Sequence, residues 1–255
     1  MAKKRSKERG IKSDETLFSI IEQLRRSGGA GVTELASELQ LAKSTVHGHL
    51  MALQDRQFVV KRGRSYHLGL EFFNYGQFVR SKIDIFQAGK FAVDRLEEAT
   101  GEMAWLITHE QGRAMYIYGR SGENDINTNS LLGRWVHMHY NSGGKAILAH
   151  LSRERVNQII DQHGLSAKTN QTITSREEVH KECARVREQG FALNFGEDLE
   201  GIHAIGVPLI FEGEIQGALS VAGPAHRLSE ERCQSELFEQ LRAVTDEIEL
   251  NLAYQ

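Results

Sequence analysis

The sequence predicts an α+β protein in which a small helical domain with a β-hairpin precedes a larger domain built on an antiparallel sheet. Apolar residues recur at helical spacing through residues 13–53, and two short strand-like segments follow them. After Glu102 the pattern changes to strands interrupted by capped helices. With 255 residues the chain is long enough for a small domain and a medium one.

Composition is that of an ordinary water-soluble protein. Hydrophobic residues make up 40% and charged residues 25% of the chain, and apolar runs such as 204–210 are too short to span a bilayer. No signal peptide opens the sequence, so we expect a cytoplasmic protein that does not bind membranes. Cys183 and Cys233 lie far apart in helical-looking segments, which favours neither a disulfide framework nor a zinc ribbon.

Charge is divided unevenly along the chain. Residues 1–67 hold 13 Lys and Arg against 7 Asp and Glu, whereas the remainder holds 18 against 27. A basic end joined to an acidic remainder indicates one part that binds a polyanion and one part with another task. Residues 1–12 are the most basic segment and predict a flexible arm that attracts phosphates, although a solvated tail without a role fits equally well.

The first helix is predicted over 16–26, with Ser13 and Asp14 as capping residues and the glycine-rich segment 27–31 ending it. Residues 32–53 then predict two short helices with a tight corner at Gln40 and Leu41. The second helix carries its polar residues near its N-terminal end, which is the part that a helix-turn-helix inserts into the DNA major groove. An ordinary surface helix pair is the alternative. The predicted DNA-facing residues of this helix are Lys43, Ser44, Thr45, His47 and His49.

A β-hairpin follows directly, with strands over 58–61 and 65–68 and a turn that carries Arg62 and Arg64. A hairpin behind a helix-turn-helix makes a winged helix, so we predict a DNA-binding domain over 13–68. The two arginines would then meet phosphates or a minor groove. Arginines on a hairpin tip are otherwise only solvated.

Residues 69–84 predict a linker whose helix covers 69–81, and a second helix covers 85–99. Aromatic residues on the linker helix either pack against a partner subunit or pack within the chain. The rest of the larger domain, 85–255, predicts an antiparallel sheet with packed helices. Its predicted strands are 103–109, 114–118, 136–140, 191–194, 202–211 and 215–221, its predicted loop is 122–130, and its predicted helices begin near Ser142, Ser152, Ser175 and Ser229.

Four sequence blocks together resemble the IclR family of transcriptional regulators. They are LAKSTVHGHLMAL (41–53), YHLG (66–69), MHYNSGGKAILA (138–149) and GIHAIGVPLIFEGEIQGALSVAGPAHRL (201–228). SGGKAILA and ALSVAGP are the specific parts, and the resemblance extends over 13–252. The ending EIELNLAYQ is similar to that of archaeal members.

The resemblance implies a GAF-like effector-binding domain and a dimer, or dimer of dimers, on DNA upstream of catabolic genes. The helix start at 141–144 has free N–H groups that could receive an anion, or that Asn141 and Ser142 simply cap. The family's pocket positions correspond here to Val136, Ser142, Gly143, Asn194, Ile202, Ala204, Ser220 and Ala222.

Several positions depart from the family pattern. Some members have a carboxylate, a thiol and a hydroxyl where this chain has Asn194, Ala204 and Ala222. Losing those polar groups favours an aromatic acid or a sugar derivative over a small oxo-acid. Ala42 replaces a helix-capping hydroxyl, for which Ser44 is the substitute.

An enzyme is the alternative to a DNA-binding regulator, because the chain has eleven histidines, which could bind a metal or take part in catalysis. His137 and His139 alternate on a predicted strand and would share one face. His109, His150, His163 and His203 are further candidates. However, no HxxxH, CxxC, GxSxG or complete phosphate loop is present, and the acidic segment 196–201 predicts a solvated loop. We therefore predict no catalytic residue, no metal and no cofactor.

These observations predict a sequence-specific DNA-binding regulator, a repressor controlled by a small organic metabolite. Its expected partners are double-stranded DNA with a pseudo-palindromic operator, the effector and a second copy of the chain. An activator or dual regulator of the same family is the alternative, followed by a metabolite-sensing interaction module without specific DNA binding.

Overall fold

The computed structural model describes residues 10–121 and 131–253 and divides into two compact units, with the boundary between Lys82 and Ile83. Most of the predicted basic arm and the whole predicted loop 122–130 lie outside the described residues. In the part that is described, no helix is both long and apolar enough to cross a membrane.

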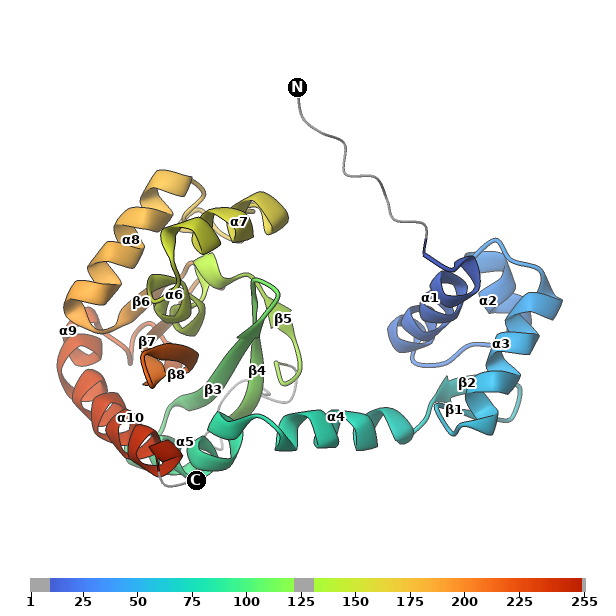
Figure 1. Cartoon of the computed structure of the whole chain (residues 1–255), viewed down its shortest axis with the longest axis horizontal. Coiled ribbons are helices and arrows are strands. Elements are labelled where there is room, and N and C mark those ends of the chain that lie inside the picture. Colours follow the sequence, from blue (N-terminus) through green and yellow to red (C-terminus); the bar gives the residue numbers. More distant parts are fainter. Residues whose placement is uncertain (1–9, 122–130, 254–255) are drawn as a thin grey trace. The chain divides into compact units, whose positions relative to one another are not determined.

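The N-terminal unit is the predicted winged helix followed by the linker helix (Figure 1). Ile20, Leu35, Val46 and Leu50 form its core, which Tyr66 of the hairpin completes. Gln40 adopts a φ of 55° at the corner between the second and third helices, and Leu41 packs against the core. Its elements are α1 (Lys12–Ser27), α2 (Val32–Glu38), α3 (Lys43–Asp55), β1 (Val59–Arg62), β2 (Ser65–Leu68) and α4 (Glu71–Ser81).

Two helix starts differ from the prediction. Helix α1 begins at Lys12, so Ser13 and Asp14 lie inside its first turn and Ile11 occupies the N-cap position. The carboxylate of Asp14 favours this start, because it lies near the positive end of the helix dipole. Helix α3 begins after Ala42 without a side-chain cap, and Ser44 does not supply one.

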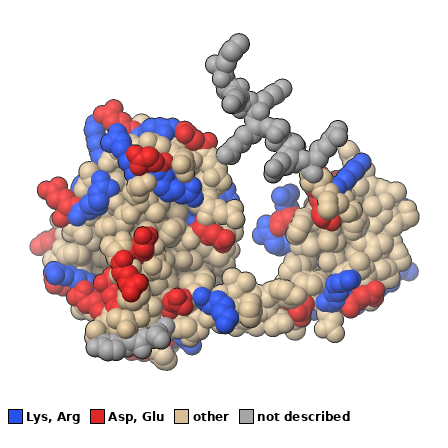
Figure 2. Space-filling model, viewed as in Figure 1, with Lys and Arg blue, Asp and Glu red and all other residues tan. Residues whose placement is uncertain are grey.

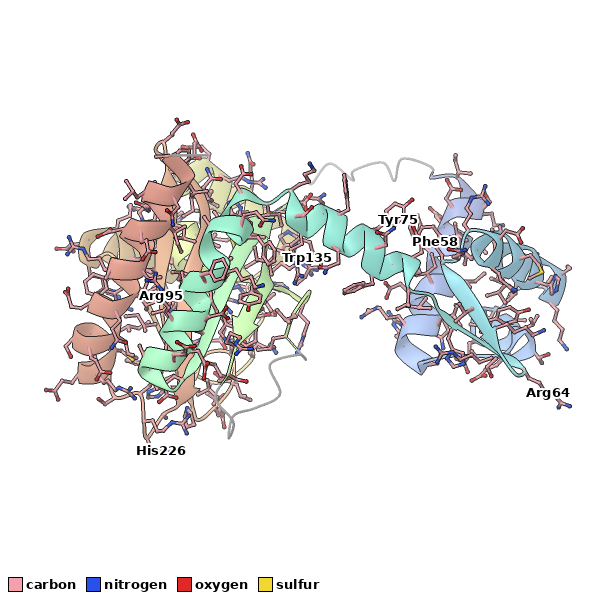
Figure 3. All side chains as sticks on the ribbon, turned by 90° about the horizontal axis from the view of Figure 1, so that it is seen from below. Phe58, Arg64, Tyr75, Arg95, Trp135 and His226 are labelled. Atoms are coloured by element: carbon pink, nitrogen blue, oxygen red, sulfur yellow. The ribbon has the colours of Figure 1, made fainter. Side chains whose placement is uncertain are left out.

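Helix α4 is anchored to the hairpin at its beginning. The Gly69 N–H donates to the carbonyl oxygen of Phe58 at 2.7 Å, and a Cβ at Gly69 would overlap the carbonyl of Gln57. The Phe58 ring packs against Phe72 and Tyr75, at centroid distances of 4.9 and 5.3 Å (Figure 3). Helix α4 is therefore part of the N-terminal unit, although it buries none of its own residues fully.

The C-terminal unit is a six-stranded antiparallel sheet, ordered β5-β4-β3-β8-β7-β6, with helices on both faces. The strands are β3 (Met103–Glu110), β4 (Arg113–Arg120), β5 (Trp135–Val136), β6 (Ala192–Phe195), β7 (Ile202–Phe211) and β8 (Glu214–Pro224). The helices are α5 (Asp84–Thr100), η2 (Met138–Tyr140), α6 (Ser142–Ala149), α7 (Arg153–His163), α8 (Arg176–Gln189), α9 (Glu230–Arg232), η3 (Cys233–Leu237) and α10 (Phe238–Ala253).

Helices α5 and α10 cover one face of the sheet and α6, α7 and α8 cover the other (Figure 1). Strand β3 alternates accordingly. Ala104 and Leu106 pack toward α5 and α10, whereas Trp105 and Ile107 pack toward α6. Because both faces are covered, strand β7 can be almost continuously apolar.

The predicted helix caps Ser152, Ser175 and Ser229 are confirmed, since each hydroxyl accepts a backbone N–H three residues later. The predicted strand over 136–140 is wrong. Only Trp135–Val136 pairs with the sheet, and Met138–Tyr140 forms a 3₁₀ turn closed by the Tyr140 hydroxyl, which accepts from the His137 N–H at 3.1 Å. His137 and His139 therefore do not share a strand face.

Candidate functional site

One face of helix α3 is exposed and polar. Val46, Leu50 and Leu53 point into the core, which turns the opposite side of the helix outward. Gly48 lies on that outward side, and a Cβ there would have no neighbour within 4 Å. The predicted DNA-facing residues Lys43, Ser44, Thr45 and His47 are exposed, and His49 is partly buried.

The hairpin presents its arginines on a two-residue turn. Arg62 pairs with Ser65 across Gly63 and Arg64, and Gly63 has a φ of 61° that suits its left-handed position. Both arginines are exposed, and neither forms an ion pair with any residue that the structure describes. Figure 3 shows Arg64 at the end of the hairpin, pointing away from its unit. The two guanidinium groups are therefore free to meet a polyanion.

The C-terminal unit contains a cavity of about 240 Å³ between the start of α6 and strands β3, β4, β7 and β8. Six of the eight predicted pocket residues line it, but Val136 and Gly143 do not. Val136 pairs with Ala114 at the edge of the sheet, and Gly143 lies against Ile107. The lining residues are Met103, Trp105, Tyr116, Leu131, Arg134, Asn141, Ser142, Asn194, Asp198, Leu199, Ile202, Ala204, Ser220 and Ala222.

Hydroxyl and amide groups are paired along the wall formed by α6. The Ser142 and Ser220 hydroxyl oxygens lie 2.8 Å apart. Asn141 accepts the Gly144 N–H at 2.8 Å, and its amide donates to the Tyr116 hydroxyl. Asn141 thus caps the helix, which was the alternative to an anion site at 141–144. Burial raises the pKa of Tyr116, so its phenol stays protonated.

An aromatic corner forms another part of the lining. The Trp105 and Tyr116 rings meet edge to face with a centroid distance of 4.9 Å. Arg134 and Asp198 supply charges of opposite sign. The sequence did not predict that Trp105, Tyr116, Arg134 and Asp198 line a cavity. Met103 and Trp105 alternate on a predicted strand, so the sequence could have placed these two side chains on the same face of the sheet.

The loop 196–201, predicted to be solvated, is exposed at Leu199, Glu200 and Gly201 but buried at Gly196 and Glu197. Asn194 connects the loop to Tyr140. The Asn194 side-chain amide accepts a hydrogen bond from the Glu197 N–H at 2.9 Å and donates one to the Tyr140 carbonyl at 2.6 Å. Glu197 is buried and lies 2.5 Å from the Lys145 ammonium, which also lies 3.0 Å from buried Glu182. Asp198 and Leu199 follow at once and line the cavity. A buried ion cluster therefore fixes this edge of the cavity.

Three of the candidate histidines form hydrogen bonds with backbone carbonyl groups. His109 binds the Ile215 carbonyl, His163 that of Gln111 and His203 that of Leu228, at 3.3, 2.8 and 2.8 Å. Among the described residues, no three His, Cys, Asp or Glu side chains are grouped so that they could hold a metal. Cys183 and Cys233 are both buried free thiols.

A winged helix with an exposed polar recognition helix, followed by a unit that encloses a small cavity, defines a ligand-responsive DNA-binding regulator. The family models agree. The model described as the IclR helix-turn-helix domain matches residues 16–63, and that described as the bacterial transcriptional regulator IclR C-terminal domain matches 77–250. The chain belongs to the IclR family, whose members are DNA-binding transcriptional regulators and not enzymes.

Curated relatives and a solved structure match most of the chain. A probable HTH-type transcriptional regulator, ArcR of Halobacterium salinarum, is 31% identical over 225 residues, which cover 86% of each chain. The HTH-type transcriptional regulator KdgR of Escherichia coli is 29% identical over 221 residues, covering 86% of this chain and 84% of KdgR. The crystal structure of Thermotoga maritima IclR aligns with a TM-score of 0.78 at 27% identity, covering 94% of this chain and 97% of that one.

The buried ion cluster generates a stability prediction. Lys145→Met should destabilise the C-terminal unit by about 3 kcal/mol at pH 7, because buried Glu197 loses its ion-pair partner and Glu182 keeps only Arg185. Burial already raises the pKa of Glu197 against the opposing effect of Lys145, and removing Lys145 raises it further. A carboxyl with a raised folded-state pKa favours the folded state increasingly as the pH falls, so part of the loss should return at about pH 5.5.

Chemical denaturation of the wild type and the variant at both pH values measures this difference. The matched control adds Glu197→Gln to Lys145→Met, which removes the unpaired carboxylate, leaves the Glu182–Arg185 pair in place and should restore most of the stability at pH 7. An equal loss at both pH values would contradict the assignment.

Proposed function

We propose that this chain binds a pseudo-palindromic operator as a homodimer, or as a dimer of dimers, in the cytoplasm, and that it represses transcription under the control of a small organic metabolite. One observation carries the proposal: an exposed polar face of α3 and a cavity with an apolar lining and a few polar groups occur in separate units of one chain. Repression is supported by a relative named the HTH-type transcriptional repressor AllR of Escherichia coli, 28% identical over 90% of this chain. Activation or dual regulation is the alternative.

In the proposed complex, Lys43, Ser44, Thr45, His47 and His49 meet the major groove, and Arg62 and Arg64 meet the flanking backbone or minor groove. Exposure of the α3 side chains and the unpaired state of the two arginines support these roles. Two recognition helices of a dimer would occupy half-sites about one helical turn, or a multiple, apart.

Helix α4 supports the proposed dimer. Phe73 and Phe78 are each 64% exposed, and Leu70, at the N-cap position of the helix, is 85% exposed. Several large apolar side chains on one short helix are unfavourable in water, so their burial against a second copy would favour association. The same helix follows the wing directly, which makes it the proposed route by which effector binding changes the arrangement of the DNA-binding units.

The effector that we propose is an aromatic acid or a sugar derivative. The Trp105–Tyr116 corner suits a ring, the Ser142–Ser220 pair suits hydroxyl groups, and Arg134 suits a carboxylate. At about 240 Å³ the cavity is smaller than the roughly 300–1,000 Å³ of sites for drug-sized ligands, so a single ring is the fitting size. The effector must bind one arrangement of the dimer better than the other, because only differential affinity shifts the equilibrium.

The proposed docking of α3 is tested by Gly48→Ala. Alanine should stabilise the helix by about 0.5–1 kcal/mol, since the site has room for a Cβ and glycine disfavours helices. The same methyl group should weaken operator binding about tenfold, because it lies on the surface that approaches the base pairs. Thermal melting and gel shifts at one fixed salt concentration measure the two opposite effects.

The matched control is Ser19→Ala on the exposed side of α1, which also adds helix propensity but adds no bulk to α3. It should raise stability and leave operator affinity unchanged. If Gly48→Ala binds the operator as tightly as the wild type, then this face of α3 does not enter the groove. Equal, salt-sensitive binding to all DNA would favour the interaction-module alternative.

Calorimetry of the full chain tests the effector class. At least one compound among benzoate, hydroxybenzoate and the sugar acids should bind with a dissociation constant below about 0.1 mM. Glyoxylate and pyruvate should bind at least tenfold more weakly than that compound. Ser220→Ala should reduce the affinity for a hydroxylated ligand and leave that for benzoate nearly unchanged, because only the former needs the hydroxyl pair. Tight binding of glyoxylate or pyruvate alone would contradict the proposed class.

A further inference from the structure

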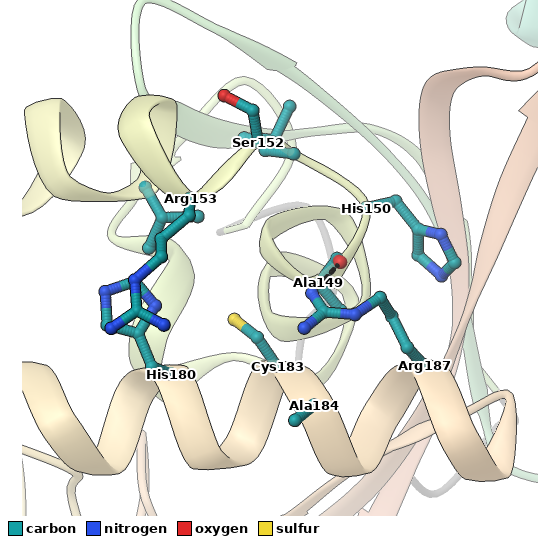
Figure 4. A pocket seen from close by; sticks show the side chains of 10 residues that line it. Ala149, His150, Ser152, Arg153, His180, Cys183, Ala184 and Arg187 are labelled. Carbon is teal, nitrogen blue, oxygen red and sulfur yellow. Dashed lines mark hydrogen bonds between the residues drawn. The ribbon is translucent and has the colours of Figure 1, made fainter.

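A second cavity lies on the outer side of the C-terminal unit, between the end of α6, the start of α7 and the middle of α8 (Figure 4). Its volume is about 500 Å³, twice that of the first cavity, and the two share no lining residue. None of the residues for which the sequence predicts ligand contact lines it. It is therefore a separate site that the proposed function does not use.

The lining of this second cavity is basic. Arg153 and His180 lie at one end in the view of Figure 4, and Arg187 and His150 lie at the other. None of its ten lining residues, all of them described, carries a carboxylate. In Figure 2 Lys and Arg side chains gather over α7 and α8 with acidic residues among them, and Glu177 lines an adjoining hollow that shares Arg153 and His180 with this cavity.

The two arginines of the cavity lack the charge partners that neighbouring arginines have. On the same helices Arg176 pairs with Asp161 at 2.5 Å, and Arg185 pairs with Glu182 at 2.7 Å. Arg187 instead donates to the Ala149 carbonyl at 2.6 Å, and the Arg153 guanidinium has no hydrogen bond or ion pair with a described residue. Their positive charges are therefore uncompensated within this part of the chain.

Two histidines lie beside these arginines in the cavity. The His150 Nε2 atom is buried without a hydrogen-bond partner, whereas the His180 Nε2 atom lies 2.9 Å from the Asn157 amide oxygen. Burial lowers the pKa of both histidines, and nearby arginines lower it further. An anion in the cavity would reverse the second effect.

The floor of the cavity does not cancel the charge. Val156 and Ala149 are apolar, and burial raises the pKa of the Cys183 thiol to about 11, so it stays neutral. Arginine forks bind phosphate oxygens in pairs, and two forks across one cavity suit a ligand with more than one anionic oxygen group.

From this arrangement we propose that the α6–α7–α8 cavity is a second ligand site, specific for a small molecule that carries two or more negative charges, of the phosphate-ester or diphosphate class. Arg153 and Arg187 bind its oxygens, and the His150 and His180 imidazoles lie beside it, within reach of its charge. The volume leaves room for an organic part beside the anionic groups.

Calorimetry of the full chain with pyrophosphate as the probe, at about 0.15 M salt, tests the proposal. Saturable binding of one pyrophosphate per chain is expected, with a dissociation constant below about 1 mM. Arg153→Gln combined with Arg187→Gln should weaken it about tenfold or more. The matched control, Arg155→Gln with Lys181→Gln, removes the same charge from the same two helices outside this cavity and should change the affinity less than twofold.

Proton NMR of the wild-type imidazoles gives a readout that does not depend on the variants folding. Pyrophosphate should shift the His150 and His180 resonances with the dissociation constant found by calorimetry. Three outcomes overturn the proposal: no saturable binding, equal weakening in the matched control, or weakening by Lys43→Gln with Arg64→Gln instead, which would place the anion on the DNA-binding surface. DNA is absent throughout, so failure of this site is distinguishable from failure of the proposed regulatory function.

Discussion

The C-terminal unit depends on the close approach of the first turn of α6 to the sheet. A Cβ on Gly206 of β7 would lie 2.7 Å from the Gly143 nitrogen and from the Ser142 carbonyl carbon, so only glycine permits this contact. The approach buries all eight residues of α6 and brings Ser142 against Ser220 of β8 and Asn141 against Tyr116 of β4. The wall of the first cavity is therefore a direct consequence of backbone packing.

The same helix also connects the charged parts of the unit. Lys145, in the middle of α6, is neutralised by Glu182 of α8 and by Glu197 of the loop that borders the first cavity. At the C-terminal end of α6 the Ala149 carbonyl accepts from Arg187 in the second cavity. Burying such charges is costly unless they are paired, so α6, α8 and the loop are held in one arrangement. Helix α6 thus lies against both cavities.

The helices, several of their starts and the exposed face of α3 could be predicted from the sequence, because local residue patterns determine them. The helical spacing of Val46, Leu50 and Leu53 fixed the outward face of α3, and hydroxyl residues located the starts of α7 and α8. Long-range partners decided the rest. The burial of Glu197 requires Lys145, and the 3₁₀ turn after Val136 depends on the Tyr140 hydroxyl. The resemblance to IclR proteins located six cavity residues, but the Trp105–Tyr116 corner became visible only in the folded sheet.

Footprinting on the DNA that flanks the protein's own gene, with and without metabolite extracts, tests most directly whether the first cavity controls DNA binding. The wild type and Ala222→Met, whose longer side chain would fill the cavity, are compared. Both proteins should protect one pseudo-palindrome, and only the wild type should change its occupancy with a metabolite. A metabolite response that Ala222→Met retains in full, or the lack of any protected sequence with either protein, would contradict this prediction.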